Sequence, residues 1–285
     1  MIFDYPPIYE NELFYVYFLR YHQFSGMRYF KESFADFKEL GLHFRSVCFP
    51  ENIGKTLKEL GISQEKFVEE HSIMPYYRLF LRKDSYEKSL NLMFYTADPY
   101  CNRYPDHLMW PRGRMALFYC PICHQNAEKA YRSIRRYQQI PGVYVCPEHR
   151  CYLKKVPVKD RMVLNTEAWD ITPHTCEKEF LYGIAEDIQS IFRNKVVIRA
   201  EEIKPKLHQK LSELNVYDAE GRWKPEFVQK IKAQYQELPQ EYAGNHELYL
   251  FGESILKENT PITNPIEYLI FIRFIYGSLQ KFLDE

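Results

Sequence analysis

Two short cysteine-containing turns constrain this chain more than any other feature of its sequence. Cys120 and Cys123 form a Cys-x2-Cys pair, and Cys146 with His149 forms a Cys-x2-His pair after twenty-two intervening residues. A proline follows the first cysteine of each pair, and aromatic or β-branched residues suited to a strand precede it. Two soft ligands on one turn facing two on another supply the closed tetrahedral shell of a structural Zn²⁺ site. We therefore expect one structural zinc ion here.

Other kinds of site share parts of this pattern. A catalytic zinc keeps one position open for water, whereas four good ligands are present here. A deaminase-type site also needs a His-x-Glu beside the cysteines, and the sequence has none there. A redox disulfide of Cys120 with Cys123 lacks the βαβ context that would support it. Cys151 is a stand-in candidate for one ligand, and His174 with Cys176 is a candidate half of a second site.

Length and composition bound the class of protein. With 285 residues the chain holds one large domain or two to three small ones, and its 46% hydrophobic residues exclude global disorder. The start, residues 1–7, is acidic and proline-broken, unlike a signal peptide, and the apolar stretch 266–276 is shorter than the roughly 18–20 residues of a membrane span. We expect a soluble protein of a reducing cytoplasm, with no membrane partner, where paired cysteines bind metal.

Apolar residues at helical spacing predict helices on both sides of the cysteine turns. Ser63 is a predicted N-cap, the Met74-Pro75 step predicts a helix break, and Pro205 is placed in a first helical turn. Asn264 and Pro265 predict a clean start for the last helix. The predicted helices cover residues 10–24, 30–40, 53–60, 63–71, 84–94, 177–193, 205–214, 225–235 and 265–275.

The predicted fold is mainly α. Helical, helix-turn-helix-like N- and C-terminal regions flank a small Cys3His zinc-finger or ribbon module. We divide the chain into an N-terminal helical region (1–97), a zinc-finger module with a basic surface (98–160) and a C-terminal helical region (161–285). The helices around 203–235 carry basic residues and fit a DNA-reading helix-turn-helix, but also any α-hairpin.

Positive charge is concentrated around the zinc module. The whole chain has a net charge of +0, so a nucleic-acid function must rest on a local patch. Between residues 112 and 161 there are eleven Lys or Arg against three Asp or Glu, with tyrosines interleaved. Phosphate contact with base stacking uses this combination; a solvated basic face or a dock for an acidic protein is the alternative. The candidate DNA-contacting residues are Arg112, Arg114, Lys129, Arg132, Arg135, Arg136, Arg150, Lys154 and Lys155.

The cysteine turns and their flanks resemble a known family. Residues 119–123 (Tyr-Cys-Pro-Ile-Cys) and 139–153 (Gln-Ile-Pro-Gly-Val to Cys-Pro-Glu-His and Leu153) resemble the zinc-finger signature of the TniQ/TnsD proteins. Further segments follow the family's order, at residues 6–13, 20–26, 49–53, 70–80 and 264–269. One departure is Ile134-Arg135-Arg136, which stands where the family commonly shows Trp-His-Arg.

The resemblance implies a non-catalytic adaptor of transposition. Such a protein recognises a double-stranded DNA attachment site, or joins an RNA-guided CRISPR effector complex, and recruits the AAA+ regulator TnsC. The sequence shows no P-loop, no triad and no carboxylate cluster for two-metal strand transfer, in agreement with a separate transposase. A metal-dependent nuclease using His149 or His174 is the enzyme alternative, and whether the protein forms a dimer stays open.

Overall fold

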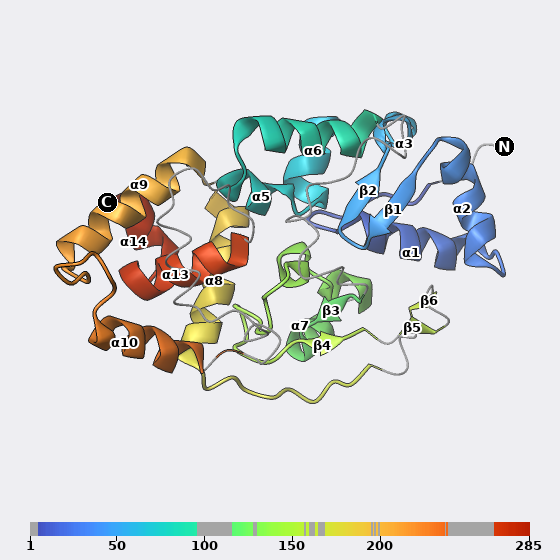
Figure 1. The fold of residues 1–285 in the computed structure, drawn as a ribbon. Helices are drawn as coiled ribbons and strands as arrows, with labels where there is room; N and C mark the ends of the chain where they lie inside the picture. The colour runs from blue at the N-terminus through green and yellow to red at the C-terminus, as the bar shows by residue number, and fades with distance from the viewer. Residues whose placement is uncertain are drawn as a thin grey trace.

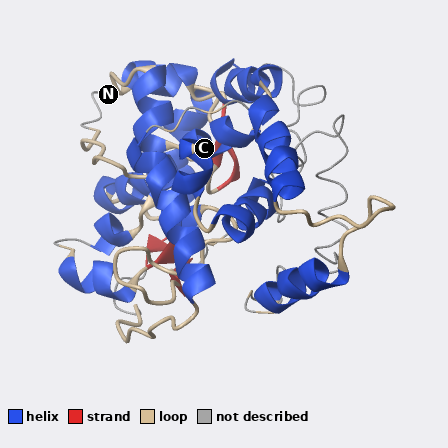
Figure 2. Ribbon diagram, turned by 90° about the vertical axis from the view of Figure 1, so that its left-hand side faces the viewer, coloured by secondary structure: helices blue, strands red, loops and turns tan. Residues whose placement is uncertain are grey.

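The fold is mainly helical, as expected, and the part of the chain that the structure describes contains three two-stranded antiparallel ribbons (Figures 1 and 2). The computed structural model describes residues 5–95, 116–127, 130–156, 158–159, 163–164, 169–194, 196, 198, 200–236, 238 and 265–285. The predicted N-cap Asn264 lies outside this described part of the chain. No helix within the described part is both long enough and apolar enough to span a bilayer.

The N-terminal region begins with a helical hairpin and a β-ribbon. Helices α1 (Phe14–Ser25) and α2 (Phe30–Glu39) are followed by β1 (His43–Ser46) and β2 (Phe49–Glu51), which pair antiparallel. The sequence predicted both helices. It did not predict the ribbon, because its strands are too short to show alternation and β2 contains a proline.

Aromatic side chains hold the hairpin together. Phe18 on α1 makes edge-on contacts with Phe34 and Phe37 on α2, with ring centroids 5.1 and 4.9 Å apart. Gly26 ends α1 with φ of 68°, the left-handed conformation that glycine adopts without a steric penalty. The periodic aromatics predicted from the sequence therefore form core contacts.

Four more helices and a π-helical turn follow in the described part of this region. The predicted N-cap Ser63 is confirmed, since its Oγ accepts a hydrogen bond from the backbone N–H of Lys66 at 3.1 Å. The predicted break at the Met74-Pro75 step was misplaced: η1 ends at His71, and Met74 and Pro75 form the first turn of α5, a helix that the sequence did not predict. The elements are α3 (Gly54–Glu59), α4 (Gln64–Lys66), η1 (Phe67–His71), α5 (Met74–Phe80) and α6 (Lys83–Tyr95).

The zinc module contains little regular structure. Its first ribbon pairs β3 with β4, and a second ribbon pairs β5 with β6. Its elements are β3 (Phe118–Tyr119), α7 (Pro121–Asn126), η3 (Ala130–Ser133), η4 (Arg136–Gln139), β4 (Lys154–Lys155) and β5 (Val158–Lys159), and β6 (Val163–Leu164) lies just beyond the predicted boundary at residue 160.

The C-terminal region is a helical bundle. Its described helices are α8 (Glu179–Asn194), α9 (Ala200–Glu213), α10 (Pro225–Tyr235), α13 (Pro265–Tyr276) and α14 (Leu279–Asp284). Pro205 lies inside α9, so its placement in a first turn was wrong, and the helix begins five residues earlier. A bridge between Tyr217 and Trp223 closes the connection 214–224. This connection is longer than the three- or four-residue turn of a DNA-reading helix-turn-helix.

The three predicted regions pack against one another. Helix α5 contacts α8 and α9, α8 contacts η4 of the module, and β6 contacts α1. Figure 1 shows the N-terminal helices and the C-terminal helices at opposite ends, with the zinc module beneath the place where they meet. The division into 1–97, 98–160 and 161–285 stays a prediction.

Candidate metal centre and the adjoining arginine joint

The first cysteine turn is the N-terminus of a helix. Strand β3 leads into Cys120, which caps α7 in an extended conformation, and its Sγ accepts the backbone N–H of Cys123 at 3.3 Å. Pro121 occupies the first helical position, where a missing N–H costs nothing. The exposed N–H groups of a helix start favour a negatively charged sulfur, so this turn is suited to hold thiolates.

The second turn is a tight loop within a short antiparallel pairing. The N–H of Cys146 donates to the carbonyl of Cys151 at 2.8 Å, and Val145 forms a bridge with Tyr152. Arg150 adopts φ of 48°, which reverses the chain within the loop. The loop thereby places the His149 ring opposite the first turn.

The four predicted ligands come together. The Nδ1 atom of His149 lies 3.5, 3.3 and 3.6 Å from the Sγ atoms of Cys120, Cys123 and Cys146. The Sγ atoms of Cys123 and Cys146 are 3.8 Å apart. A tetrahedral zinc with ordinary bond lengths needs sulfur–nitrogen edges of about 3.6 Å and sulfur–sulfur edges of about 3.8 Å. The donor set therefore fits one zinc ion, and all four ligand atoms lie within 4.8 Å of one another.

The buried thiols share protons through hydrogen bonds, and a bound cation would take the place of these protons. Hydrogen bonds from Cys123, Cys146 and Cys151 lower the pKa of the Cys120 thiol, and the hydrogen bond with Cys120 in turn raises the pKa of the Cys123 thiol. Three cysteine ligands are 6% exposed or less. Several buried thiols can be ionised together only when a positive charge lies beside them, and a bound divalent cation would supply that charge.

Groups around the ligands fix their positions. Glu148, which precedes the histidine ligand, accepts hydrogen bonds from the Tyr137 hydroxyl and the Gln189 amide, both at 3.1 Å. Arg193 on α8 lies 3.3 Å from the same carboxylate. The zinc loop is thus tied to α8, an outer contact of the kind that orients metal ligands.

A cavity of about 630 Å³ borders the centre. Cys123 and His149 form part of its wall, and residues 9–12 of the N-terminal region and other residues of the zinc module form the rest. Arg132 and Arg135 also line the cavity, and the Arg132 guanidinium lies 4.5 Å from the centre of the Tyr9 ring. The cavity therefore lies at the seam between the zinc module and the N-terminal region.

A buried cluster, here called the arginine joint, fills the interior side of this seam. It consists of Asn11, Glu12, Arg20, His71, Ser72 and Arg136. Arg20 is 0% exposed and donates from Nε and Nη2 to the two carboxylate oxygens of Glu12 at 2.9 and 2.7 Å. A further bond runs from its Nη2 to the carbonyl of Pro7 at 2.7 Å. Such a bidentate ion pair gives each buried charge an opposite charge and hydrogen-bond partners.

Arg136 brings the zinc module into the joint. It is 3% exposed, and its guanidinium donates to the Ser72 carbonyl at 3.2 Å and to the Asn11 side chain at 3.0 Å. It also lies 4.8 Å from the Phe192 ring centre on α8. Burial lowers the pKa of this arginine to about 10. The joint therefore connects three parts of the chain through one cation.

Comparison with known families identifies the chain. A family model of the TniQ domain matches residues 5–153, a span that covers more than half of the chain and contains both the metal ligands and the arginine joint. The chain belongs to the TniQ family. It is therefore a transposition-associated protein. A search of the curated proteins found no match.

Several predicted DNA-contacting cations of this TniQ protein already have partners. Arg150 forms an ion pair with Glu179, and Lys154 forms one with Asp170. Arg136 is in the interior, where a phosphate cannot reach it. Arg132 and Lys155 are exposed and Arg135 is half-buried. The predicted contacts Arg112, Arg114 and Lys129 lie outside the described residues.

A second metal site is not assembled in the described chain. Within those residues, the four predicted ligands are the group of three or more His, Cys, Asp and Glu donors close enough to hold one ion. The backbone N–H of Cys176 donates a hydrogen bond to the carbonyl of Arg150, and the carbonyl of His174 accepts one from the N–H of Tyr152. These residues therefore serve as a third strand-like segment beside the zinc loop.

Sequence reasoning missed the role of Glu12, Arg20 and His71. The Nδ1 atom of His71 lies 3.0 Å from the Glu12 carbonyl across the joint. All three occur in the TniQ-like segments at 6–13, 20–26 and 70–80. The family motif was the signal that marked them, because nothing in the local pattern shows that these segments meet.

Proposed function

We propose that this protein is a non-catalytic target-site selector of a transposon. It binds double-stranded target DNA, recruits a TnsC-like AAA+ regulator, and leaves strand transfer to a separate transposase. The TniQ match over residues 5–153 carries this proposal. It is supported by the metal-organised module, whose closed Cys3His set offers no vacant position for catalysis. The proposed place of action is the cytoplasm, where thiols stay reduced and available to zinc.

The proposed DNA surface lies on the zinc module beside the cavity. Arg132 and Arg135 stand at its rim, and Lys155 extends from β4. Arg150 and Lys154 are left out of this surface because each is ion-paired with a carboxylate. Phosphate contacts by arginine and lysine give salt-dependent affinity, with about one unit of slope lost for each contact removed.

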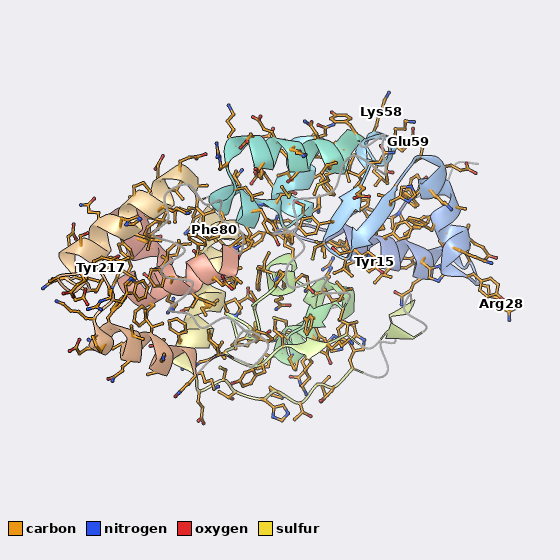
Figure 3. The ribbon with its side chains drawn as sticks, in the orientation of Figure 1. Tyr15, Arg28, Lys58, Glu59, Phe80 and Tyr217 are labelled. Carbon is orange, nitrogen blue, oxygen red and sulfur yellow. The ribbon has the colours of Figure 1, made fainter. Side chains whose placement is uncertain are left out.

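The test is filter binding with matched variants. The triple variant Arg132→Ala, Arg135→Ala, Lys155→Ala is expected to weaken duplex binding and reduce the salt slope by two to three units, or about one per contact. The control is Lys58→Ala, an exposed lysine that projects from α3 away from the zinc module (Figure 3). Equal binding of the wild type and the triple variant would contradict the proposed surface.

An RNA-guided adaptor is the second candidate. Its support is the pairing of Arg150 and Lys154 with carboxylates and the burial of Arg136, which leave fewer cations for direct DNA contact. An adaptor is expected to show no selective DNA binding at physiological salt and to copurify with a CRISPR effector complex. A protein that reads DNA itself is expected to bind an attachment site more tightly than a scrambled duplex, with an affinity that falls steeply as salt is raised.

The enzyme alternative makes a separate prediction. A metal-dependent nuclease would nick plasmid DNA in Mg²⁺ or Mn²⁺. The histidine proposed for it, His149, lies among three thiols in a zinc-binding geometry, and His174 belongs to no metal-binding group among the described residues. We expect intact supercoiled plasmid after incubation, and nicking lost in a His149→Ala variant would overturn the non-catalytic assignment.

A further inference from the structure

The zinc centre contains a fifth sulfur or nitrogen donor that four-coordinate zinc does not need. Cys151 is 1% exposed, and its Sγ lies 3.3 Å from the Sγ of Cys120. It shares one buried cluster with the three cysteine ligands. The contact is shorter than the sulfur–sulfur edge of about 3.8 Å expected for two thiolates on one zinc. Cys151 therefore stands directly beside the ligand shell.

The backbone of Cys151 is held on both sides. Its carbonyl accepts the N–H of Cys146, and it forms a bridge with Thr175 on the neighbouring segment. These contacts keep the residue next to the metal when other ligands change. With the backbone held, the sulfur can change its position by rotation of the side chain about its own bonds.

Among the four predicted ligands, His149 is the most exposed. It is half-buried, whereas the three cysteine ligands are buried, and it lines the cavity together with Cys123. Backbone and amide groups fix two of the sulfurs: Cys120 accepts the Cys123 N–H, and Gln138 Nε2 lies 3.8 Å from Cys146 Sγ. Removal of the imidazole would thus leave three thiolates in place and a fourth thiol 3.3 Å from one of them.

We propose that Cys151 is a reserve zinc ligand. When His149 is absent, Cys151 occupies the fourth position and converts the Cys3His centre into a centre of four cysteine thiolates. Its S–H proton passes to solvent, and the thiolate lone pair forms the Zn–S bond that replaces the Zn–N bond. No oxidant or reductant takes part. A four-thiolate shell is softer, so the converted centre favours thiophilic ions such as Cd²⁺ more than the original centre does.

The experiment compares four full-length proteins purified in zinc: the wild type, His149→Ala, Cys151→Ser and the double variant. Zinc content is measured directly, and Co²⁺ is then substituted for zinc. The wild type, Cys151→Ser and His149→Ala are each expected to bind about one ion per chain, and the double variant less than about a tenth of that. The sulfur-to-cobalt charge-transfer absorption of His149→Ala should be about four-thirds that of the wild type, because four thiolates replace three.

Three results would overturn the proposal. Zinc loss or failure to fold in His149→Ala, even in excess zinc, would show that Cys151 does not reach the metal. Retained zinc with a three-thiolate cobalt spectrum would show that water, not sulfur, fills the position. A weaker charge-transfer band in Cys151→Ser than in the wild type would show that Cys151 is already a ligand beside His149. None of these readouts depends on DNA binding.

Discussion

At the scale of single residues, the buried charges of the arginine joint depend on one another for partners, because water cannot reach them. Glu12 and Arg20 are almost completely removed from water, and each satisfies the other. Arg136 joins them from the zinc module through Asn11 and Ser72. Removing one member leaves a charge or an acceptor without a partner, which costs far more than losing an exposed ion pair.

The substitution Glu12→Gln tests this directly. Arg20 then keeps its charge in a dry site without a carboxylate, so we expect the free energy of unfolding to fall by about 3–5 kcal/mol. The control Glu10→Gln changes an exposed neighbour and should stay within about 0.5 kcal/mol of the wild type. Urea denaturation measures both. Equal destabilisation by the two variants would mean that the pair contributes little.

His71 gives the fold a dependence on pH. Burial lowers its pKa from the usual value of 6.5. The unfolded chain therefore binds a proton that the folded chain resists, so stability is full above about pH 6.5 and decreases as pH falls below it. We expect His71→Gln to lose less stability than the wild type between pH 7.5 and 5.5. Protonation of the zinc ligands weakens both proteins, so the difference between their urea midpoints isolates His71. An identical loss in both would contradict the assignment.

The zinc ligands could be predicted from the sequence, but the arginine joint could not. Cys-x2-Cys and Cys-x2-His spacing constrains ligand geometry locally, so the four residues were found before any fold was known. Arg136 is different: in the sequence it is one of eleven basic residues, and its burial depends on Ser72 and Asn11, which are distant in the chain. Local charge does not indicate which cation will be covered by another segment.

At the scale of elements, Asp187 on α8 organises the C-terminal bundle. Its two carboxylate oxygens accept hydrogen bonds from Arg273 on α13, at 2.8 Å, and from the N–H of Leu279 at the start of α14, at 3.0 Å. The same arginine donates to the Gly183 carbonyl at 2.8 Å. One carboxylate thus connects α8 to two later helices, α13 and α14.

The substitution Asp187→Asn keeps the shape of this side chain and removes its charge. A hydrogen bond to a charged group contributes about 1.5–3 kcal/mol, so we expect a loss of that size in the free energy of unfolding. Glu186→Gln, one residue away and exposed, is the matched control and should change little. Urea unfolding followed by tryptophan fluorescence reports the result. A stability equal to that of the control would mean that Asp187 does not organise the bundle.

Helices were predictable where the apolar pattern was long. The stripe of α8 and the nearly all-apolar α13 require burial, and both are buried. The ribbon of β1 and β2 was missed because four and three residues are too few to show alternation. The early start of α9 was missed because Pro205 suggested a first turn, whereas packing of Ile203 and Leu207 holds a helix that runs through it.

At the scale of the whole molecule, the metal and the joint act on the same seam. The zinc module packs against the N-terminal region through Arg136 and against α8 through Glu148. We therefore expect the loss of a bound metal to affect more than the cysteine turns. We propose that one zinc ion, bound by Cys120, Cys123, Cys146 and His149, is required for this TniQ region to fold.

Metal analysis of the purified protein, together with one variant, tests this claim most directly. We expect about one zinc ion per chain, and Cys123→Ser should lose both zinc and the folded module, because zinc binding of roughly 10 kcal/mol or more is folding free energy in such sites. Cys176→Ser, a buried cysteine outside the ligand set, should keep zinc. A wild-type protein that is fully folded and free of zinc would contradict the claim.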